Sequence, residues 1–340
     1  MQHRLLKNLN VSPIGMGCMG LSHGYGRVPE RAVSIDAIRA AVDFGCNFFD
    51  TAEVYGREMF YEGHNEEIVG EALKPCRKDV VLATKIHLRT EEVESGKDLY
   101  AIAREHLAAS MERLQTDYVD LYYLHRLNEL VPVEEVAGVM GRLIDEGLIR
   151  GWGLSQVSVE TLDAANRVTP VTAVQSIYSM VERGLEKDIF PYCLEHGIGV
   201  VPFSPIASGL LSGKVTVETK FEGDDVRKFV PQLSKENLVA NRPLIDLLST
   251  FAERKNATNA QISLAWMLKK YPNVVPIPGS KVKERILENL GAWNVELTDA
   301  EFAELERELD RRTVHGQRGY VESEQNLFSN HWLKAREAKS

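Results

Sequence analysis

Short apolar runs recur along nearly the whole chain, and amphipathic segments separate them. Several runs are apolar almost throughout, as over residues 198–201, which is typical of strands buried on both faces of a parallel sheet. We expect strands over residues 46–50, 80–84, 118–124, 149–154, 173–178, 198–203, 274–277 and 292–295. Strands that alternate with helices along the chain predict an α/β fold.

The segments between the runs show helical spacing of their apolar residues. Ser34–Phe44 and Val133–Glu146 each place apolar side chains three or four residues apart, on one face of a helix. Gly45 follows the first segment and Gly147 lies just past the second, where a glycine typically ends a helix. We therefore expect crossover helices between parallel strands.

Eight predicted strands with crossover helices favour a closed (β/α)8 TIM barrel, formed by residues 1–340 as a single domain. The count alone leaves an open doubly wound sheet as the alternative. Two short extended runs around an asparagine-bearing turn, within residues 5–17, predict an N-terminal β-hairpin at the barrel floor. The strandless connection from Ala207 to about Asn241 predicts long loops over the C-terminal face. We expect the polar tail Arg311–Ser340 either to cover the barrel mouth or to be partly disordered.

The charge and the cysteines narrow the possible partners. A net charge of −9 argues against nucleic acid or an anionic membrane surface as the main partner. No window approaches the roughly 18 apolar residues of a spanning helix, and the N-terminus lacks a signal peptide, so we expect a cytoplasmic protein. The four cysteines are far apart in sequence, which favours reduced thiols over disulfides or a metal site.

Four chemically reactive residues lie at or just past the ends of three successive apolar runs. Asp50 ends the first run, Tyr55 lies in the loop that follows it, Lys85 ends the second run and His125 the third. Because active sites of parallel barrels lie at the carboxyl ends of the strands, we expect these residues on one rim. Each residue also has an ordinary structural alternative. Asp50 could cap a helix and Tyr55 could be a half-buried loop aromatic. Lys85 could be a solvated strand end and His125 a hydrogen-bonded core histidine.

The segments that carry these residues resemble the aldo-keto reductase superfamily, most closely its bacterial and plant-type branch. The matching motifs are Phe49-Asp50-Thr51-Ala52-Glu53-Val54-Tyr55-Gly56, Ala83-Thr84-Lys85 and Asp120-Leu121-Tyr122-Tyr123-Leu124-His125-Arg126. The resemblance extends from Gly15 to Ala292. It implies an NADPH-dependent enzyme that reduces small aldehydes or ketones, with Asp50, Tyr55, Lys85 and His125 as its catalytic tetrad.

Carbonyl reduction needs a hydride donor and a proton donor for the developing alkoxide. Tyr55 is the expected general acid, and an adjacent Lys85 ammonium can lower the pKa of its phenol by up to about three units. Asp50 is expected to hold Lys85 in place. A neutral His125 is expected to orient the carbonyl.

No Gly-x-Gly-x-x-Gly motif follows a predicted strand, so a different segment must bind the cofactor phosphates. After Gly279, Ser280 can cap a helix whose N-terminus favours phosphate, with Lys281 and Arg285 on one helical face. An ordinary charged, solvated helix start is the alternative. The resemblance implies that Ser280, Lys281 and Arg285 bind the 2′-phosphate of NADPH and that Glu288 and Asn289 bind the adenine.

The resemblance also implies residues for the rest of the cofactor. Ser155, Gln156 and Gln175 are expected at the nicotinamide carboxamide, and Phe203 is expected to stack on the ring. The residues expected along the pyrophosphate are Ser204, Pro205, Ile206, Ser208 and Lys214.

The chain departs from the family pattern in three places. Gln156 replaces a more usual Asn or Glu, Pro205–Gly209 replaces Pro-Leu-Gly, and Arg57–Asn65 is longer than usual. We expect the last of these to alter the substrate pocket.

Two other functions stay open. A barrel of this superfamily can act as an NADP(H)-binding regulatory subunit of a membrane channel, with little turnover. Lys85 can also be read as a Schiff-base lysine of an aldolase, which a neighbouring Asp50 disfavours by keeping the amine protonated. The sequence specifies neither the carbonyl substrate nor whether the protein forms a homo-oligomer.

Overall fold

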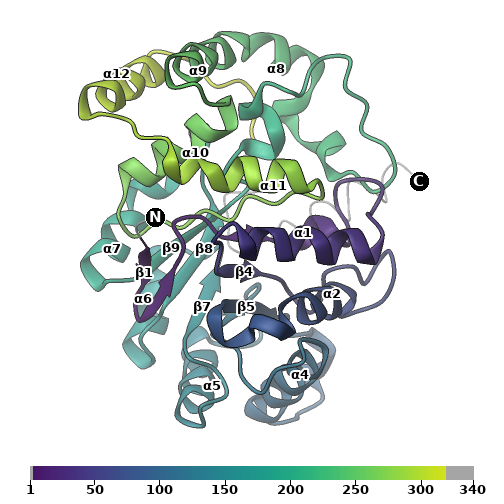
Figure 1. Cartoon of the computed structure of the whole chain (residues 1–340). Coiled ribbons are helices and arrows are strands. Elements are labelled where there is room, and N and C mark those ends of the chain that lie inside the picture. The colour runs from purple at the N-terminus through teal and green to yellow at the C-terminus, as the bar shows by residue number, and fades with distance from the viewer. Residues whose placement is uncertain (1–2, 319–340) are drawn as a thin grey trace.

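The computed structural model of the chain describes residues 3–318, and it has the predicted α/β barrel architecture. Seven parallel strands pair in chain order around the barrel, with helices on the outside (Figure 1). The strands are β3 (Met16–Gly17), β4 (Phe48–Asp50), β5 (Val81–Ile86), β6 (Leu121–Leu124), β7 (Trp152–Ser155), β8 (Ala173–Ile177) and β9 (Gly199–Phe203).

An extended segment, residues 273–279, closes the ring between β9 and β3. The Val275 and Ile277 amides donate to carbonyls of β9 at 2.9 and 3.0 Å, and a parallel bridge joins Gly279 to Gly17. Pro276 and Pro278 have no N–H group, so this segment cannot form a full ladder. The strand predicted over 274–277 is therefore an interrupted one.

The strand predicted over residues 292–295 is wrong. This segment begins as a 3₁₀-helix, Gly291–Asn294, and only Val295 beyond it is extended. Its place in the ring is taken by β3, which the sequence had placed in the N-terminal hairpin region. At two residues β3 is too short for its period to be seen in the sequence.

The hairpin forms as predicted, and its apolar side chains pack into the floor of the barrel. Strands β1 (Arg4–Leu6) and β2 (Leu9–Val11) pair antiparallel, and Leu6, Leu9 and Val11 are buried among the inward side chains of the ring. Gly199 allows the close approach, because a Cβ there would lie 2.3 Å from Leu6 Cδ2.

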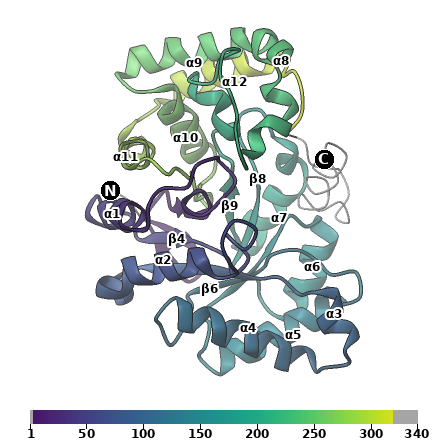
Figure 2. The same ribbon diagram turned by 90° about the vertical axis from the view of Figure 1, so that its right-hand side faces the viewer.

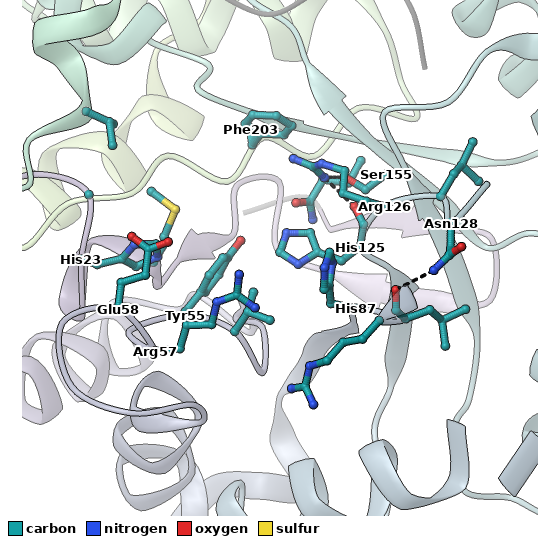
Figure 3. Close-up of a pocket in the computed structure, with 18 of the residues that line it drawn as sticks. His23, Tyr55, Arg57, Glu58, His87, His125, Arg126, Asn128, Ser155 and Phe203 are labelled. Carbon is teal, nitrogen blue, oxygen red and sulfur yellow. Dashed lines mark hydrogen bonds between the residues drawn. The ribbon is translucent and has the colours of Figure 1, made fainter. Parts of the chain in front are cut away.

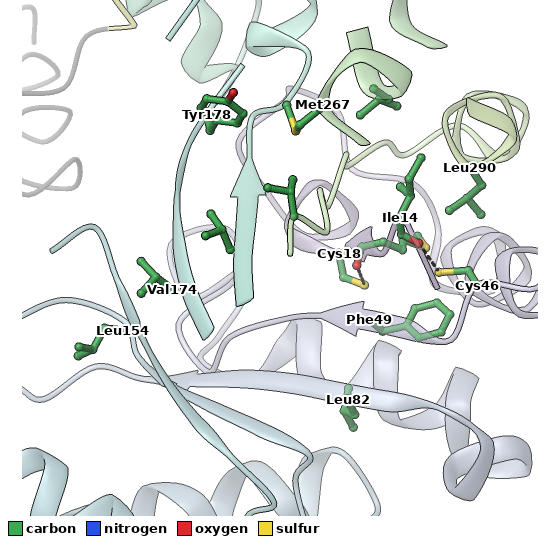
Figure 4. Close-up of a cluster of buried hydrophobic side chains, with 14 of the residues drawn as sticks. Ile14, Cys18, Cys46, Phe49, Leu82, Leu154, Val174, Tyr178, Met267 and Leu290 are labelled. Atoms are coloured by element: carbon green, nitrogen blue, oxygen red, sulfur yellow. Dashed lines mark hydrogen bonds between the residues drawn. The ribbon is translucent and has the colours of Figure 1, made fainter. Parts of the chain in front are cut away.

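The helices cover the outer face of the ring. Figure 4 shows part of the apolar layer between them and the strands, with Phe49, Leu82, Leu154 and Val174 pointing outward. The helices are α1 (Arg31–Asp43), α2 (His64–Leu73), α3 (Thr90–Glu94), α4 (Leu99–Arg113), α5 (Val133–Asp145), α6 (Val159–Val168), α7 (Ile189–His196), α8 (Lys235–Ala240), α9 (Arg242–Lys255), α10 (Asn259–Lys270), α11 (Lys283–Leu290) and α12 (Asp299–Asp310).

Strand register positions the functional groups. Phe48, Val81, Ala83, Leu121 and Tyr123 belong to the buried cluster inside the ring. Since side chains alternate along a strand, the next inward positions fall at the carboxyl ends of β4, β5 and β6. Those positions hold the acid, the amine and the imidazole singled out in the sequence.

The connection after β9 contains no strand, as predicted, and consists of 3₁₀ turns that lead to α8. Figure 2 shows α8, α9 and α12 grouped at one end of the molecule. The tail is described only as far as Arg318, so most of the segment expected at the barrel mouth lies outside the described residues.

All four cysteines are free thiols, and Cys18, Cys46 and Cys193 are buried. Between residues 3 and 318, no helix is long and apolar enough to cross a membrane. The same part of the chain has no cluster of His, Cys, Asp or Glu suited to a metal ion.

Candidate active site

A cavity of about 1320 Å³ opens at the carboxyl ends of the strands. Asp50, Tyr55 and His125 line it, together with residues of the loops that follow the strands (Figure 3). Lys85 is fully buried immediately behind this surface. The four residues predicted to lie together at the carboxyl ends of the strands therefore do so.

Lys85 connects the other members of the cluster. Its Nζ donates to Asp50 Oδ1 at 2.5 Å, to the Thr51 carbonyl at 2.6 Å and to Tyr55 Oη at 3.1 Å. These three bonds use all three hydrogens of the ammonium. The Tyr55 and His125 rings meet edge to face at 5.7 Å between centroids.

Charges in this cluster set the protonation states. Burial by itself lowers the pKa of Lys85, but Asp50 and Tyr55 outweigh it and raise that pKa above its ordinary value. Lys85 is therefore a stable cation.

The net shift expected for Tyr55 was wrong in direction. Burial raises the pKa of the Tyr55 phenol, and this effect exceeds the lowering caused by Lys85 and by Arg126. The lysine acts in the expected direction, but the sequence could not reveal how strongly the surrounding protein desolvates the phenol. Tyr55 is consequently a protonated donor at neutral pH.

His125 is neutral in this environment. Burial lowers its pKa well below the ordinary value, and the nearby Arg126 and Lys85 charges lower it further. Its Nδ1 is buried and has no hydrogen-bond partner within residues 3–318. A neutral imidazole can donate from one nitrogen only, which suits it to a carbonyl oxygen.

Gln175 has a contact that the sequence did not reveal. Its Nε2 donates to Asp50 Oδ2 at 2.7 Å, so Asp50 is held by Lys85 on one oxygen and by Gln175 on the other. Gln175 also lines the cavity next to Ser155. The residue expected at the carboxamide thus also fixes the acid.

A second buried network lies behind the loop that carries Tyr55. The Glu53 carboxylate accepts from the His87 amide at 2.6 Å and contacts His106 Nδ1 at 2.8 Å. His106 Nε2 contacts Glu92 of α3 at 3.1 Å. Burial opposes protonation of His106, but the two carboxylates prevail and raise its pKa.

Several residues expected to bind the cofactor lie on the cavity wall. They are Ser155, Gln175, Phe203, Ser204 and Gly279. Gln156 follows Ser155 in the chain. Its buried Oε1 atom has no hydrogen-bond partner within residues 3–318. Arg126 donates to Ser155 Oγ at 2.9 Å.

Unusual backbone conformations gather in the loops expected to hold the cofactor. Gln156, Ser204, Ala207 and Ser208 have φ of 54°, 51°, 48° and 55°, in the region that L-residues rarely adopt. The Ser208 hydroxyl is buried and unpartnered in the described part of the chain. Strained backbone with unsatisfied polar atoms is typical of ligand-binding loops.

The other expected cofactor residues lie outside the cavity lining, in α11 or in the connection after β9. Lys214, in the connection after β9, pairs with Glu288 of α11 at 3.2 Å. Asn289 is buried, Ile206 packs against the core, and the Pro205 carbonyl accepts from Ser263 at 3.4 Å.

The predicted helix cap at Ser280 is wrong. Helix α11 begins at Lys283, and Ser280 Oγ instead accepts from the Val282 amide in the preceding turn. Lys281 lies outside the helix and donates to the Tyr25 and Arg27 carbonyls at 2.6 Å each. Only Arg285 of the two expected phosphate cations is on the helix.

The loops around the cavity contribute unevenly to its lining. Residues 126–133 all line the cavity, and Asp224, Val226, Lys228 and Phe229 line it from the long connection. Of the long segment Arg57–Asn65, only Arg57 and Glu58 reach the cavity. The other cavity residues not predicted from sequence include His23, His87 and Arg126. Position just after His125 was the only sequence signal for Arg126.

Known proteins resemble this chain over most of its length. The model of the Aldo/keto reductase family matches residues 13–310. A Glycine max protein named as an aldo-keto reductase is 35% identical over 320 residues, covering 92% of this chain and 90% of the relative.

Solved structures show the same similarity. A glycerol dehydrogenase from Gluconobacter oxydans has a TM-score of 0.81 at 27% identity, over 94% of this chain and 98% of that one. A Klebsiella pneumoniae aldo-keto reductase in complex with NADPH has a TM-score of 0.70 at 27% identity, over 93% of this chain and 100% of that one.

Proposed function

This chain belongs to the aldo/keto reductase family and is an NADP-dependent oxidoreductase, and from that premise we propose that Asp50, Tyr55, Lys85 and His125 carry out its carbonyl reduction. The observation that carries the proposal is the position of Lys85 Nζ, within hydrogen-bond distance of both Asp50 and Tyr55 at the cavity wall. The substrate is a small aldehyde or ketone that enters this cavity.

Tyr55 is the proton donor to the carbonyl oxygen. Its phenol lines the cavity and is protonated, because burial raises its pKa. Lys85 lies 3.1 Å from Tyr55 Oη and stabilises the phenolate that forms when the proton leaves. Asp50 and Gln175 keep the ammonium in position.

His125 orients the substrate. Its neutral ring stands edge-on to Tyr55, so both groups address the same part of the cavity. Two donors at one carbonyl oxygen favour the charge that develops there during reduction.

The loops at the carboxyl ends of β7 and β9 fit a bound NADPH. The unpartnered polar atoms of Gln156 and Ser208, and the strained backbone that carries them, provide unused hydrogen-bonding capacity. When bound, NADPH supplies the hydride. Ser155, Gln156, Gln175 and Phe203 would hold its nicotinamide, and the residues for the pyrophosphate would be Ser204, Pro205, Ile206, Ser208, Lys214 and Gly279.

We propose that Ser280, Lys281 and Arg285 bind the 2′-phosphate of NADPH and that Glu288 and Asn289 bind its adenine. Arg285 forms no ion pair within residues 3–318, whereas Lys281 already bonds two carbonyls. Arg285→Ala is therefore expected to weaken NADPH binding more than Lys281→Ala does. Equal affinities of wild type and Arg285→Ala for NADPH would show that the phosphate binds elsewhere.

The structure gives little support to an aldolase. A Schiff-base lysine needs a free amine. All three Lys85 hydrogens are engaged, and its pKa is raised. The other alternative is a regulatory subunit with little turnover. A measurement of carbonyl reduction distinguishes it from an enzyme.

The test is NADPH oxidation followed by absorbance across aliphatic, aromatic and dicarbonyl substrates. Tyr55→Phe removes the proton and little volume, so we expect kcat to fall by roughly 100-fold or more. Its affinity for NADPH, measured by fluorescence, should stay unchanged. Near-normal turnover by Tyr55→Phe would refute Tyr55 as the acid, and no turnover by the wild type would favour the regulatory role.

A further inference from the structure

Arg126 is a cation on the cavity wall with no acidic partner. It forms no ion pair with a carboxylate within residues 3–318. Burial lowers the pKa of Arg126 to about 10, so the guanidinium keeps its charge at neutral pH. The side chain is half-buried. A charge that is partly removed from water and has no counterion is costly, and binding an anion would offset that cost.

Its hydrogen-bonding capacity is also unused. One terminal nitrogen donates to the His125 carbonyl at 2.5 Å and to Ser155 Oγ at 2.9 Å, while the buried Nε has no partner in the described part of the chain. Guanidinium carries five N–H groups in a planar fork that matches a carboxylate. Figure 3 shows the side chain between His125 and Phe203, on the cavity wall.

The cofactor phosphates are not the missing anion. Of the residues proposed to bind them, Ser208, Lys214 and Arg285 do not line this cavity. Ser204 and Gly279 do line it, but they lie after β9 and in the closing segment, whereas Arg126 follows β6. Arg126 instead follows His125 directly, at the end where the carbonyl is expected. An anion at Arg126 must therefore arrive with the substrate.

We propose that Arg126 binds a carboxylate of the substrate, so that the preferred substrates are oxo acids, meaning aldehydes or ketones that carry a carboxylate. This inference rests on the proposed function. The carbonyl carbon of the oxo acid gains the hydride and its oxygen gains the Tyr55 proton, which gives a hydroxy acid while NADPH is oxidised to NADP⁺. The Tyr55 phenolate then regains a proton from solvent.

Charge balance supports the assignment. Arg126 by itself opposes the positive charge that NADP⁺ carries after the hydride has left, and a carboxylate on Arg126 offsets that repulsion. The other acids of the cavity do not take this place. Glu58, Glu91, Glu94 and Glu129 are exposed, where water and salt screen their charges. Asp50 is already bonded by Lys85 and Gln175, and Asp224 accepts from the Gly24 amide at 2.7 Å.

The experiment compares oxo acids with their uncharged methyl esters, in a series that varies the distance between carbonyl and carboxylate. For wild type we expect kcat/KM for the best acid to exceed that of its ester. Arg126→Gln should reduce this acid-to-ester ratio by roughly 10- to 100-fold, the range for a charge-assisted hydrogen bond. Arg126→Lys should keep part of the preference, because the charge remains without the fork.

Arg57→Gln is the matched control. Arg57 also lines the cavity but is exposed, so its removal should change the ratio less than about threefold. Propanoate and propanamide provide a readout without turnover: propanoate should inhibit wild type more strongly, and Arg126→Gln should remove the difference.

The outcomes separate the inference from the proposed function. Equal losses for acid and ester in Arg126→Gln, or weaker NADPH binding with an unchanged ratio, would overturn the carboxylate site and leave carbonyl reduction standing. A wild type that reduces esters but not acids would do the same. A wild type that reduces no carbonyl compound would refute the proposed function itself.

Discussion

Lys85 has no contact with solvent, and its hydrogen bonds replace the hydration that an ammonium needs. The Asp50 carboxylate supplies the balancing charge at 2.5 Å, and the Thr51 carbonyl and Tyr55 hydroxyl complete the set. A buried pair of this kind contributes little net stability, because desolvation offsets the attraction. What it provides is a cation fixed beside Tyr55.

Removing one partner of this pair should be costly. Lys85→Met leaves Asp50 buried without its counterion, so we expect the free energy of unfolding to fall by about 3–5 kcal/mol. Asp50→Asn/Lys85→Met should regain much of that loss, because no charge remains unpaired. Chemical denaturation measures both, and a double variant as unstable as the single one would contradict this account.

In the same variants, we expect stability to recover without a recovery of activity. The double variant lacks the cation that stabilises the Tyr55 phenolate, so its turnover should stay low although it folds. Recovery of turnover together with stability would show that Lys85 has a structural role only.

The pH dependence of reduction follows from two shifts. The pKa of Tyr55 lies above its ordinary value of 10.0, and that of His125 lies well below 6.5. The acid form of Tyr55 and the neutral form of His125 therefore coexist across the neutral range. We expect kcat/KM for reduction to be flat from about pH 7 to about pH 10 and to fall above it. A midpoint near neutrality would instead indicate a phenol whose pKa the lysine has lowered.

The residues of the rim could be predicted because strand ends are visible as the ends of apolar runs. Their mutual contacts could not. The bond from Gln175 to Asp50 joins residues 125 positions apart, and no local pattern encodes it. No role could be predicted for Arg126, because an arginine after a strand is ordinary until its surroundings are known.

At the scale of elements, His106 of α4 links α3 to the loop between β4 and α2. The loop contributes Glu53, and α3 contributes Glu92, which also pairs with Arg89 at 3.2 Å. Since Glu53 stands between Asp50 and Tyr55 in the chain, this network steadies the loop that carries the proton donor.

We expect the network to stabilise the protein more at low pH. The folded-state pKa of His106 is raised, so its contribution is complete below the unfolded value of 6.5 and disappears as the pH rises through the folded value. His106→Gln should lower the free energy of unfolding by about 1–2 kcal/mol near pH 6 and by less near pH 9. Urea unfolding of both proteins at the two pH values measures this, and an equal loss at both would mean that the imidazolium is not involved.

The errors in the fold prediction have one physical origin. Closure of a barrel is decided by pairing between distant segments, here Gly17 with Gly279, rather than by local periodicity. A two-residue strand such as β3 leaves no pattern, and Pro276 and Pro278 obscure the segment opposite it. The longer strands β5, β8 and β9 were predicted to within about two residues.

At the scale of the whole molecule, the hairpin at the floor of the ring and the helices outside it pack on the same strands. We therefore expect one cooperative unfolding transition, as for a single domain, with equal calorimetric and van't Hoff enthalpies. NADPH at about 100 times its Kd should add about 2.7 kcal/mol to the stability. Scanning calorimetry with and without NADPH tests both, and two resolved transitions would show that the chain divides into domains.

The closing segment, residues 273–279, has a consequence for how this protein is made. It comes late in translation, yet it pairs with β3 near the N-terminus, so the ring stays open until the ribosome has released more than three quarters of the chain. The helix proposed to bind the adenosine end of the cofactor, α11, is made later still. If the proposed assignments hold, a nascent chain contains the residues of the proton-donating cluster before those of the adenosine site, and NADPH can bind only after α11 has been synthesised.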